Sequence, residues 1–442
     1  MAPPRPSVLR RNRRALLAAV ACTGAVVPVT WGPSARAATA SIGPSVLVRP
    51  PADAAAAPVA SFDAIACGSS TVCVAVGRYE AASARGLPFA ATMTARGWSR
   101  AVSVAPPAGR AGAHSTAGLA AVACPSATAC VAVGSYVDAA GNERPMVANE
   151  LAGTWSAAVP VALPAAAAAT NEQAQLDAVS CAAVGSCVAA GVYTTATGAV
   201  RLMAATSIAG SWGAAVSIAL PADAGSVPRT PGAVALSGIS CAATTDCVAV
   251  GDYLDAAGGY APIHVTLTAG AWGQARRVHV ALRARLVSTA DLAAVSCATP
   301  TACVAVGGAA NLAGRPVEIA AAQAAGGWGV AVASGRLPAT QPHLLGARLD
   351  GVTCPAVGSC LAVGAATTAT GQTVALVRDQ HVQWALSQEV RAPRAFGPAT
   401  SALLRAVACV QATRCVAVGS VTTTSRSGTV IDARPFATLL TL

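Results

Sequence analysis

Short runs of Val and Ala alternate with turns of Gly, Pro, Asp and Ser from about residue 63 to the end of the chain. The most regular copy of this pattern begins at Leu119 and passes through four such runs to Leu163-Pro164. Short segments rich in small and β-branched residues and bounded by turn residues predict β-strands. We therefore expect units of four antiparallel strands, repeated along the chain.

The cysteines give this repeat its period. Fourteen of the fifteen cysteines form pairs with five intervening residues, and the pairs follow one another at 55 to 60 residues. A fixed period of this size indicates one supersecondary unit in tandem. The repeats are predicted to begin near residues 63, 120, 177, 237, 293, 350 and 405. The pairs are Cys67/Cys73, Cys124/Cys130, Cys181/Cys187, Cys241/Cys247, Cys297/Cys303, Cys354/Cys360 and Cys409/Cys415.

Four-stranded antiparallel units in series predict an all-β fold, a seven-bladed β-propeller. The seventh repeat ends soon after its third strand, whereas residues 43–51 resemble the fourth strand of the other repeats. We expect this N-terminal strand to complete the last blade, because a closed ring leaves no exposed sheet edge. The prediction is therefore one domain over residues 38–442.

Two further landmarks keep register with the cysteines. A Gly lies four residues after the second Cys of every pair, as at Gly134. A Trp lies 30 or 31 residues after the first Cys in the first six repeats, as at Trp155, and we expect these rings to pack in the core or between blades. In the strand from Cys130 to Gly134, Cys, Ala and Gly share one face and two Val residues the other. A small face of one blade can then pack against a bulky face of the next.

The N-terminal segment has the layout of a secretory signal peptide. Arginines at 10–14 precede the apolar stretch 15–29, and Ala35-Arg36-Ala37 is a small-residue cleavage site, so residues 1–37 are predicted to be removed. Arg13-Arg14 also allows a twin-arginine signal. The unpaired Cys22 either leaves with the signal or, as an alternative, anchors a lipoprotein. We expect a secreted or cell-wall-associated protein.

Composition narrows the picture further. All 29 basic residues are Arg, which with the high Ala content suggests the codon usage of an actinobacterium. Removal of residues 1–37 takes away six arginines and lowers the formal net charge from +11 to +5. This mild bias favours no nucleic-acid partner. No apolar run of 18 residues follows the signal, so no membrane span is predicted, and we expect a monomer.

Oxidation is the expected state of the paired cysteines. On an exported chain an even number of regularly spaced cysteines favours disulfides, and each pair would lie opposite on the first and second strands of its unit. Free buried thiols and metal binding are the alternatives. Five intervening residues fit zinc poorly, because zinc prefers two to four.

The repeated unit V-[SA]-C-x5-C-V-A-V-G, followed by G-x-W, resembles secreted bacterial repeat proteins of the Asp-box, sialidase-like propeller group, and is most similar to cysteine-containing actinobacterial members. The resemblance covers all seven repeats and implies the propeller fold. The Asp of the Asp-box is missing, as in Ala152-Gly153-Thr154-Trp155. The arginine motif of sialidases is also missing, and Arg144, Arg315 and Arg434 precede prolines where a third strand should begin.

The functional residues are expected where the repeats differ. The variable second-to-third-strand loops and the joins between blades are predicted to lie on one face. Four tyrosines share one position in the first four repeats and, with two arginines, are candidates for a binding rim, whereas a half-buried strand end is the alternative for the tyrosines. These candidates are Tyr79, Tyr136, Tyr193, Tyr253, Arg144 and Arg315.

Motifs for a catalytic centre, a metal or a cofactor are missing. Five His residues are scattered, and neither G-x-S-x-G, a P-loop nor H-E-x-x-H occurs. Asp138 and Asp255, at matching loop positions, suit turns. The sequence favours a noncatalytic binding or scaffold propeller at the cell envelope, with a polysaccharide or a protein as its partner and no cofactor. The alternative is an extracellular glycosidase or lyase with its site on the loop-rich rim or at the channel mouth.

Overall fold

The computed structural model describes residues 40–442 except 84, 111–115, 171, 226–232, 282–288, 312–313, 335–336, 338–342, 382, 395–400 and 425–429. The predicted signal peptide and Cys22 lie outside these residues. The chain divides into two units, Met1–Ala37 and Ala38–Leu442, and the second is described here. Its described residues form strands and turns, with no α-helix. No helix long and apolar enough to cross a membrane occurs in the described part of the chain.

Each cysteine pair lies in an antiparallel hairpin, as predicted. The first strand of each hairpin carries the first Cys and the second strand carries the second Cys. The first strands are β2 (Ala60–Cys67), β7 (Ala117–Ser126), β12 (Ala174–Ala183), β17 (Val234–Ala243), β23 (Thr289–Thr299), β28 (Leu344–Ala356) and β33 (Ser401–Gln411). The second strands are β3 (Cys73–Glu80), β8 (Ala129–Val137), β13 (Ser186–Thr194), β18 (Asp246–Leu254), β24 (Ala302–Ala310), β29 (Ser359–Thr368) and β34 (Arg414–Thr424).

A third strand pairs antiparallel with each second strand. In the first six repeats the predicted fourth strand is broken into two short pieces, and one further short strand follows them in the fourth repeat. The third strands are β4 (Gly86–Thr94), β9 (Glu143–Leu151), β14 (Val200–Ile208), β19 (Tyr260–Thr268), β25 (Pro316–Ala324), β30 (Thr373–His381) and β35 (Val430–Thr441). The short pieces are β5 (Gly97–Trp98), β6 (Val102–Ser103), β10 (Thr154–Trp155), β11 (Val159–Pro160), β15 (Ser211–Trp212), β16 (Val216–Ile218), β20 (Ala271–Trp272), β21 (Arg276–Arg277), β22 (Val280–Ala281), β26 (Gly327–Trp328), β27 (Ala331–Ala333), β31 (Gln383–Trp384) and β32 (Gln388–Val390).

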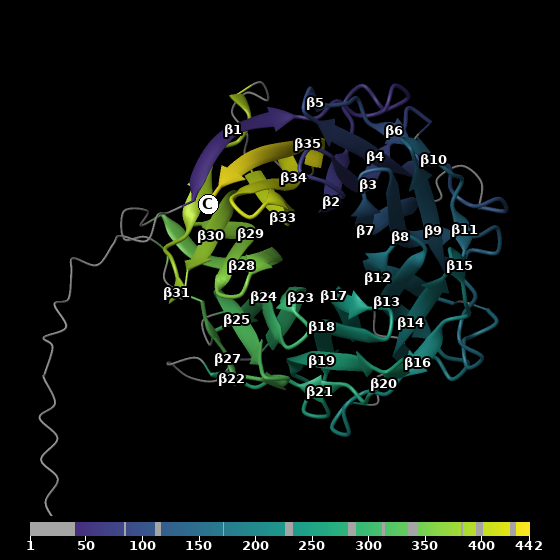
Figure 1. Ribbon diagram of the computed structural model, residues 1–442. Helices are drawn as coiled ribbons and strands as arrows, with labels where there is room; N and C mark the ends of the chain where they lie inside the picture. The colour runs from purple at the N-terminus through teal and green to yellow at the C-terminus, as the bar shows by residue number, and fades with distance from the viewer. Residues whose placement is uncertain are drawn as a thin grey trace, which may run out of the picture. The chain divides into compact units, whose positions relative to one another are not determined.

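The sheets fit the blades of a propeller. The described strands form six hydrogen-bonded sheets. The largest has eleven strands and contains the antiparallel strands of the fourth and fifth repeats, which are linked by parallel pairing of β19 with β23 and of β22 with β27. The first strands contact one another in chain order, and β33 contacts β2. Figure 1 shows these strands nearest the centre of the unit and the short pieces at its periphery.

Strands from both ends of the unit share one sheet. β1 (Ser41–Leu47) pairs antiparallel with β35, in a sheet of order β1-β35-β34-β33. The pairing runs from Ser41 opposite Thr441 to Leu47 opposite Phe436. The N-terminal strand therefore takes the place of the missing fourth strand of the last repeat.

Neighbouring sheets pack a small face against a bulky one, which confirms the prediction from strand parity. Val74 and Val76 of β3 share a buried cluster with Cys130 and Ala132 of β8. The same relationship recurs between the last sheet and the first, where Val416 and Val418 lie with Cys73 and Ala75. The six repeated Trp rings are half-buried and pack against these clusters, as Trp155 does against the first.

All fourteen paired cysteines form disulfides within their own hairpins, as predicted. The Cα–Cα distances lie between 3.8 Å for Cys409–Cys415 and 4.1 Å for Cys124–Cys130 and Cys354–Cys360. Disulfides of this number persist in an oxidising environment. Between three pairs of neighbouring first strands, the backbone N–H of the first Cys also donates to a Ser hydroxyl of the preceding sheet, as Cys241 does to Ser180 over 3.0 Å.

Each disulfide joins a half-buried or buried first Cys to a second Cys in the core. The second Cys of every pair is buried, with an exposed fraction of at most 4%, and packs in a hydrophobic cluster with the neighbouring sheet. The first Cys is half-buried in six pairs and buried in the sixth repeat, at Cys354. The second cysteines therefore form part of the packed frame of the sheets. The buried second cysteines are Cys73, Cys130, Cys187, Cys247, Cys303, Cys360 and Cys415.

Candidate functional site

Each first strand contains a β-bulge, at which one residue departs from the ordinary alternation of side chains between the two faces of the sheet. In β12 the register shifts between Leu176 and Ala178, so Asp177 is the bulged residue. The same shift occurs at the corresponding place in all seven first strands. A bulge re-aims a side chain and is common beside functional sites. The bulged residues are Asp63, Ala120, Asp177, Ser237, Ala293, Asp350 and Arg405.

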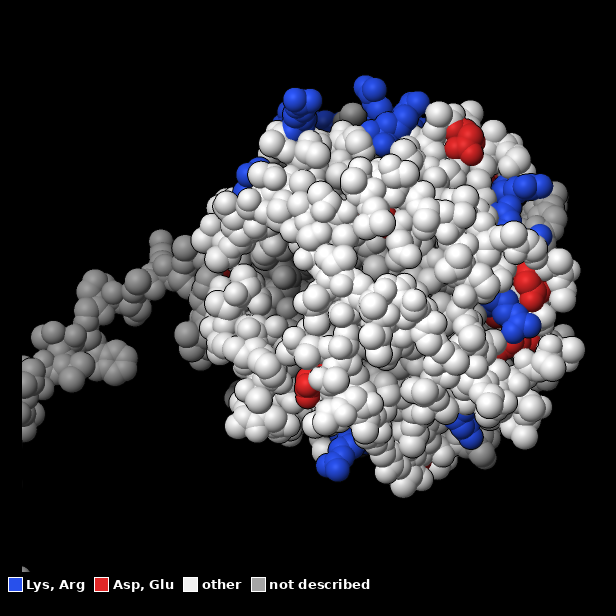
Figure 2. Space-filling view, turned by 45° about the vertical axis from the view of Figure 1, so that its right-hand side comes forward, with Lys and Arg blue, Asp and Glu red and all other residues white. Residues whose placement is uncertain are grey.

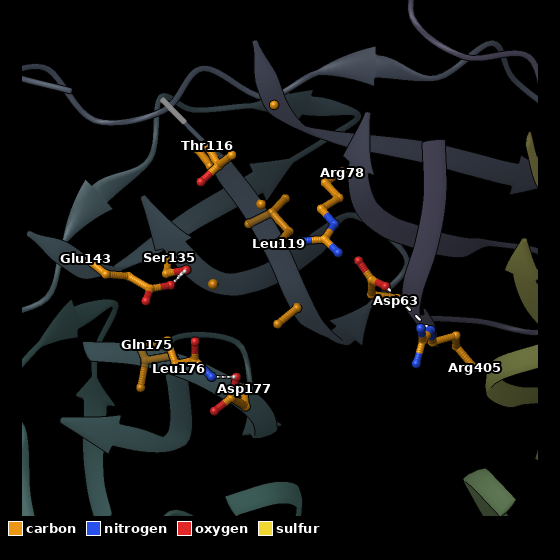
Figure 3. A pocket seen from close by; sticks show the side chains of 15 residues that line it. Asp63, Arg78, Thr116, Leu119, Ser135, Glu143, Gln175, Leu176, Asp177 and Arg405 are labelled. Atoms are coloured by element: carbon orange, nitrogen blue, oxygen red, sulfur yellow. Dashed lines mark hydrogen bonds and ion pairs between the residues drawn. The ribbon is translucent and has the colours of Figure 1, made fainter. Parts of the chain in front are cut away.

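Four of these bulged residues line one pocket with a volume of about 460 Å³. They come from β33, β2, β7 and β12, which are successive first strands. The close view in Figure 3 shows polar side chains directed into this space from separate strands. The charged and amide side chains in the lining are Asp63, Arg78, Glu143, Gln175, Asp177 and Arg405.

One side of the pocket is basic. Arg405 Nε lies 3.9 Å from Asp63 Oδ1, and Arg78 of β3 acts on the same carboxylate. Burial raises the pKa of Asp63 to about 6, and the two arginines oppose that shift. Asp63 is therefore ionised above about pH 6 and partly neutralised by its neighbours.

The other side of the pocket is acidic. Glu143 of β9 accepts a hydrogen bond of 2.7 Å from the Ser135 hydroxyl, and Asp177 accepts one of 2.9 Å from the Gln175 amide. Burial raises the pKa of Asp177 to about 7, the Gln175 hydrogen bond lowers it, and the Glu143 charge raises it further. Near neutral pH Asp177 therefore gains and loses a proton beside the Glu143 carboxyl group.

A second charged cluster lies on the first and second strands of later repeats. Arg348 of β28 bonds Asp291 of β23 over 3.0 Å and Asp350 over 2.7 Å. Burial raises the pKa of Asp252 on β18 to about 7, as does the neighbouring Asp291 charge, and Arg348 lowers it. Arg348 therefore already bonds two of the three carboxylates in this cluster.

The four tyrosines of the predicted binding rim are buried, and this corrects the prediction that they form an exposed contact surface. Their exposed fractions are 1%, 6%, 1% and 0% for Tyr79, Tyr136, Tyr193 and Tyr253. The Tyr79 hydroxyl donates to Asp53, and the Tyr253 hydroxyl donates over 2.8 Å to Asp223, a residue of a blade join. Burial raises the pKa of both phenols to about 12.

The two arginines of the predicted rim have different surroundings. Arg144 bonds Asp138 over 3.1 Å and also Glu172, so it ties a second-to-third-strand loop to the following join. Arg315 is exposed, and its backbone N–H donates to Asn311 Oδ1 over 3.1 Å. Neither is in the lining of the pocket. A binding role for these arginines remains a prediction.

The predicted loop arrangement holds in the first four repeats. Isolated bridges join each blade connection to the neighbouring second-to-third-strand loop, as between Arg110 and Asp138 and between Ala224 and Asp255. Both aspartates accept backbone hydrogen bonds within their own turns, as predicted. Parts of the later joins, such as residues 282–288 and 338–342, lie outside the described residues.

Charge on the outer surface is sparse where it can be seen. On the face drawn in Figure 2, Arg, Asp and Glu side chains lie mostly toward the edge, and its centre is uncharged. No group of three or more His, Cys, Asp or Glu side chains that could hold a metal occurs among the described residues. Among the residues that the structure describes, the pocket on the first strands gathers side chains of both charges, of which Arg405 and Asp63 lie 3.9 Å apart.

The sequence contained a signal for this pocket that the strand pattern alone did not expose. The residue after the buried Leu or Phe of each first strand changes from repeat to repeat, while its neighbours hardly vary. Asp, Ala, Ser and Arg occupy this one position. Variation confined to one place in a rigid repeat marks a position that packing does not dictate.

Neither a family model nor the sequence of a curated protein matches this chain. Solved structures of sialidases, polysaccharide lyases and lectins are similar to it in outline. A protein of unknown function from Dyadobacter fermentans is 11% identical, with 91% of this chain and 99% of that chain covered and a TM-score of 0.46. A family PL25 ulvan lyase is 8% identical, with 89% and 94% covered and a TM-score of 0.47. The Trypanosoma rangeli sialidase is 10% identical, with 91% and 59% covered and a TM-score of 0.43.

Proposed function

We propose that residues 38–442 form a single seven-bladed β-propeller, exported by the N-terminal segment and closed by β1. The pairing of β1 with β35 supports this closure. The packing of Val416 and Val418 against Cys73 and Ala75 supports it too, because it joins the last hairpin to the first. Export to an oxidising compartment agrees with the seven disulfides.

We propose that this propeller is a noncatalytic binding module of the cell envelope, and that its ligand is a polysaccharide held in the pocket on the first strands. The observation that carries the proposal is the pocket itself. Hydrogen-bond donors and acceptors from four successive sheets converge on about 460 Å³ of space. Fixed polar groups in a concave site set the orientation of a hydroxyl-rich ligand, and a rigid strand places them better than a loop.

The experiment is a binding measurement with the full exported chain. Envelope polysaccharides are titrated against the wild-type protein and against D63N, Q175A and R405Q. We expect each variant to weaken binding and R100Q, a change at the exposed Arg100 outside the pocket lining, to leave it unchanged. Equal binding by wild type and all three pocket variants would refute the proposed site.

Catalysis is the second candidate, and one observation favours it. Asp177, with its pKa raised to about 7, shares the pocket with Glu143. Two carboxyl groups in one site, of which one takes up and releases a proton near neutral pH, are suited to general acid–base catalysis of glycoside hydrolysis. A screen with glycoside and uronide polymers separates the two functions. Turnover that D177N abolishes while polysaccharide binding persists would establish the enzyme.

A further inference from the structure

The two sides of the pocket carry opposite charge, and each side lacks a full counter-charge. On the basic side two guanidiniums, Arg78 and Arg405, share the single carboxylate of Asp63. On the acidic side Ser135 and Gln175 donate hydrogen bonds to Glu143 and Asp177, and both of these donors are neutral. The pocket is thus electrically asymmetric across its width.

Arg78 acts electrostatically on the Asp63 carboxylate but makes no direct ion pair with it. Its stem lies against the backbone of Gly118, since a Cβ on Gly118 would be only 3.3 Å from the Arg78 Cβ. Among the residues that the structure describes, its guanidinium has no ion-pair or hydrogen-bond partner. Its donors therefore remain available to a ligand, and guanidinium donors match the geometry of carboxylate and phosphate oxygens.

The acidic side is equally open to a cation. Glu143 and Asp177 line the same pocket, and the Glu143 charge contributes to the raised pKa of Asp177. A positively charged group between them would relieve this repulsion and favour the ionised form of Asp177. An ammonium group has the charge and the several N–H donors that two such carboxylates can accept.

We infer that the unit recognised in this pocket is a saccharide that carries both an ammonium group and an anionic group. This inference rests on the proposed binding function. The anionic group binds Arg78 and Arg405, the ammonium group binds Glu143 and Asp177, and the ring hydroxyls bond the amide of Gln175. A volume of about 460 Å³ suits a ligand of one or two sugar rings.

Four probes of one sugar skeleton test the inference. Glucosamine 6-phosphate carries both charges, glucosamine and glucose 6-phosphate carry one each, and glucose carries none. Each is titrated by calorimetry at pH 7 into the full chain. We expect glucosamine 6-phosphate to bind at least about fivefold tighter than either singly charged probe, since each charge-assisted contact adds independently.

Two variants assign the charges to the two sides. R78Q should remove the advantage of the phosphate and keep that of the ammonium group, and E143Q should do the reverse. R100Q, a change outside the pocket lining, should alter neither advantage. Far-ultraviolet circular dichroism and thermal unfolding of each variant check that the fold is intact.

The outcomes separate this inference from the proposed function. The doubly charged ligand is wrong if all four probes bind alike, or if R78Q and E143Q fail to discriminate between them. The binding site nevertheless stands if D63N, Q175A and R405Q still weaken polysaccharide binding. If none of the five variants affects polysaccharide binding and no probe binds, both the ligand and the site are wrong.

Discussion

A Cβ placed on Gly191 would lie 2.0 Å from the carbonyl oxygen of Gln175. Gly191 on β13 pairs with Leu176, the residue before the bulge of β12, and the bulge pushes the Gln175 carbonyl toward it. The corresponding distance is between 1.9 and 2.1 Å in all seven hairpins. The repeated Gly is therefore a requirement of the bulge that carries the pocket residues.

Replacing Gly191 by Ala should accordingly destabilise the protein by about 3 kcal/mol, because the carbonyl and its strand must move. Urea unfolding monitored by Trp fluorescence measures the change. G213A is the matched control, since a Cβ there would meet its nearest atom, the Thr206 carbonyl oxygen, at 3.6 Å. If G191A loses no more stability than G213A, the bulge accommodates the added methyl group and the proposed requirement for Gly is wrong.

The fold could be predicted from sequence because its determinants repeat. The period of the cysteines, and the Val face opposite the Cys and Ala face, indicated sheets that pack in series, and the clusters around Cys130 and Cys73 confirm that packing. The site could not be predicted in the same way. Strict two-residue alternation gives no place to Asp63 or Asp177 in the pocket, because a bulge changes the direction of both. The repeated Gly that accommodates each bulge lies on the partner strand, so its role becomes clear only once the pairing of the strands is known.

The tyrosines failed as a binding surface for a related reason. Their position at the end of a second strand was read correctly, since Tyr79 is the seventh of the eight residues of β3. What covers them comes from the joins between blades, where Asp53 and Asp223 accept hydrogen bonds from their hydroxyls. Burial by a segment from elsewhere in the chain is a tertiary effect that the repeat alone does not contain.

A buried ion pair joins two neighbouring sheets and should be costly to break. Arg378 on β30 bonds Glu318 on β25, and Ser387 bridges them with hydrogen bonds of 3.0 Å to each. Both side chains are buried. R378M leaves the Glu318 carboxylate buried without its cation, so we expect a loss of about 3–5 kcal/mol in urea unfolding.

The double variant R378M/E318Q should recover part of that loss, because the carboxylate at position 318 that lost its cation is then replaced by a neutral amide, while Asp379 beside it stays buried. R434M serves as the control, since Arg434 and Asp432 form a partly exposed pair that contributes about 0–1 kcal/mol. If R378M and R434M cost the same, the pair between β25 and β30 adds nothing to the packing of the two sheets.

Removing one disulfide should lower stability without changing the fold. C181A/C187A removes a disulfide that closes a short loop and joins two cysteines whose Cα atoms are 4.0 Å apart. The loop-entropy relation assigns ~2 kcal/mol of stabilisation to a disulfide that closes such a loop. Thermal unfolding without reductant measures the loss. Thiol titration of the unfolded, unreduced wild type should detect none of the fourteen paired cysteines, and fourteen reactive thiols would contradict the disulfides.

Deletion of residues 38–47 tests closure by β1. Without this strand the edge of β35 is exposed, and exposed edges pair with other chains. We expect a lower unfolding temperature and association that increases with protein concentration, followed by analytical ultracentrifugation. A synthetic peptide of residues 38–49 should restore the monomer, whereas a peptide of the same composition in scrambled order should not. A deletion variant that stays monomeric and equally stable would exclude closure by this strand.

Asp177 should make stability depend on pH. Its pKa is about 7 in the folded chain against an ordinary value of 3.8, chiefly because of burial. Between about pH 4 and pH 7 the unfolded chain therefore binds fewer protons at this residue than the folded chain, and stability falls as pH rises.

The variant D177N cannot ionise at this position, so its stability should lack this fall. We expect D177N to equal wild type near pH 4 and to exceed it at pH 8 by on the order of 1 kcal/mol, since Asp177 is only half-buried and solvent screens part of the effect. D246N, at the exposed Asp246, should follow the wild-type curve at both pH values. Parallel curves for wild type and D177N would mean that Asp177 is ionised throughout, which would also remove the proton that a catalytic role for this residue requires.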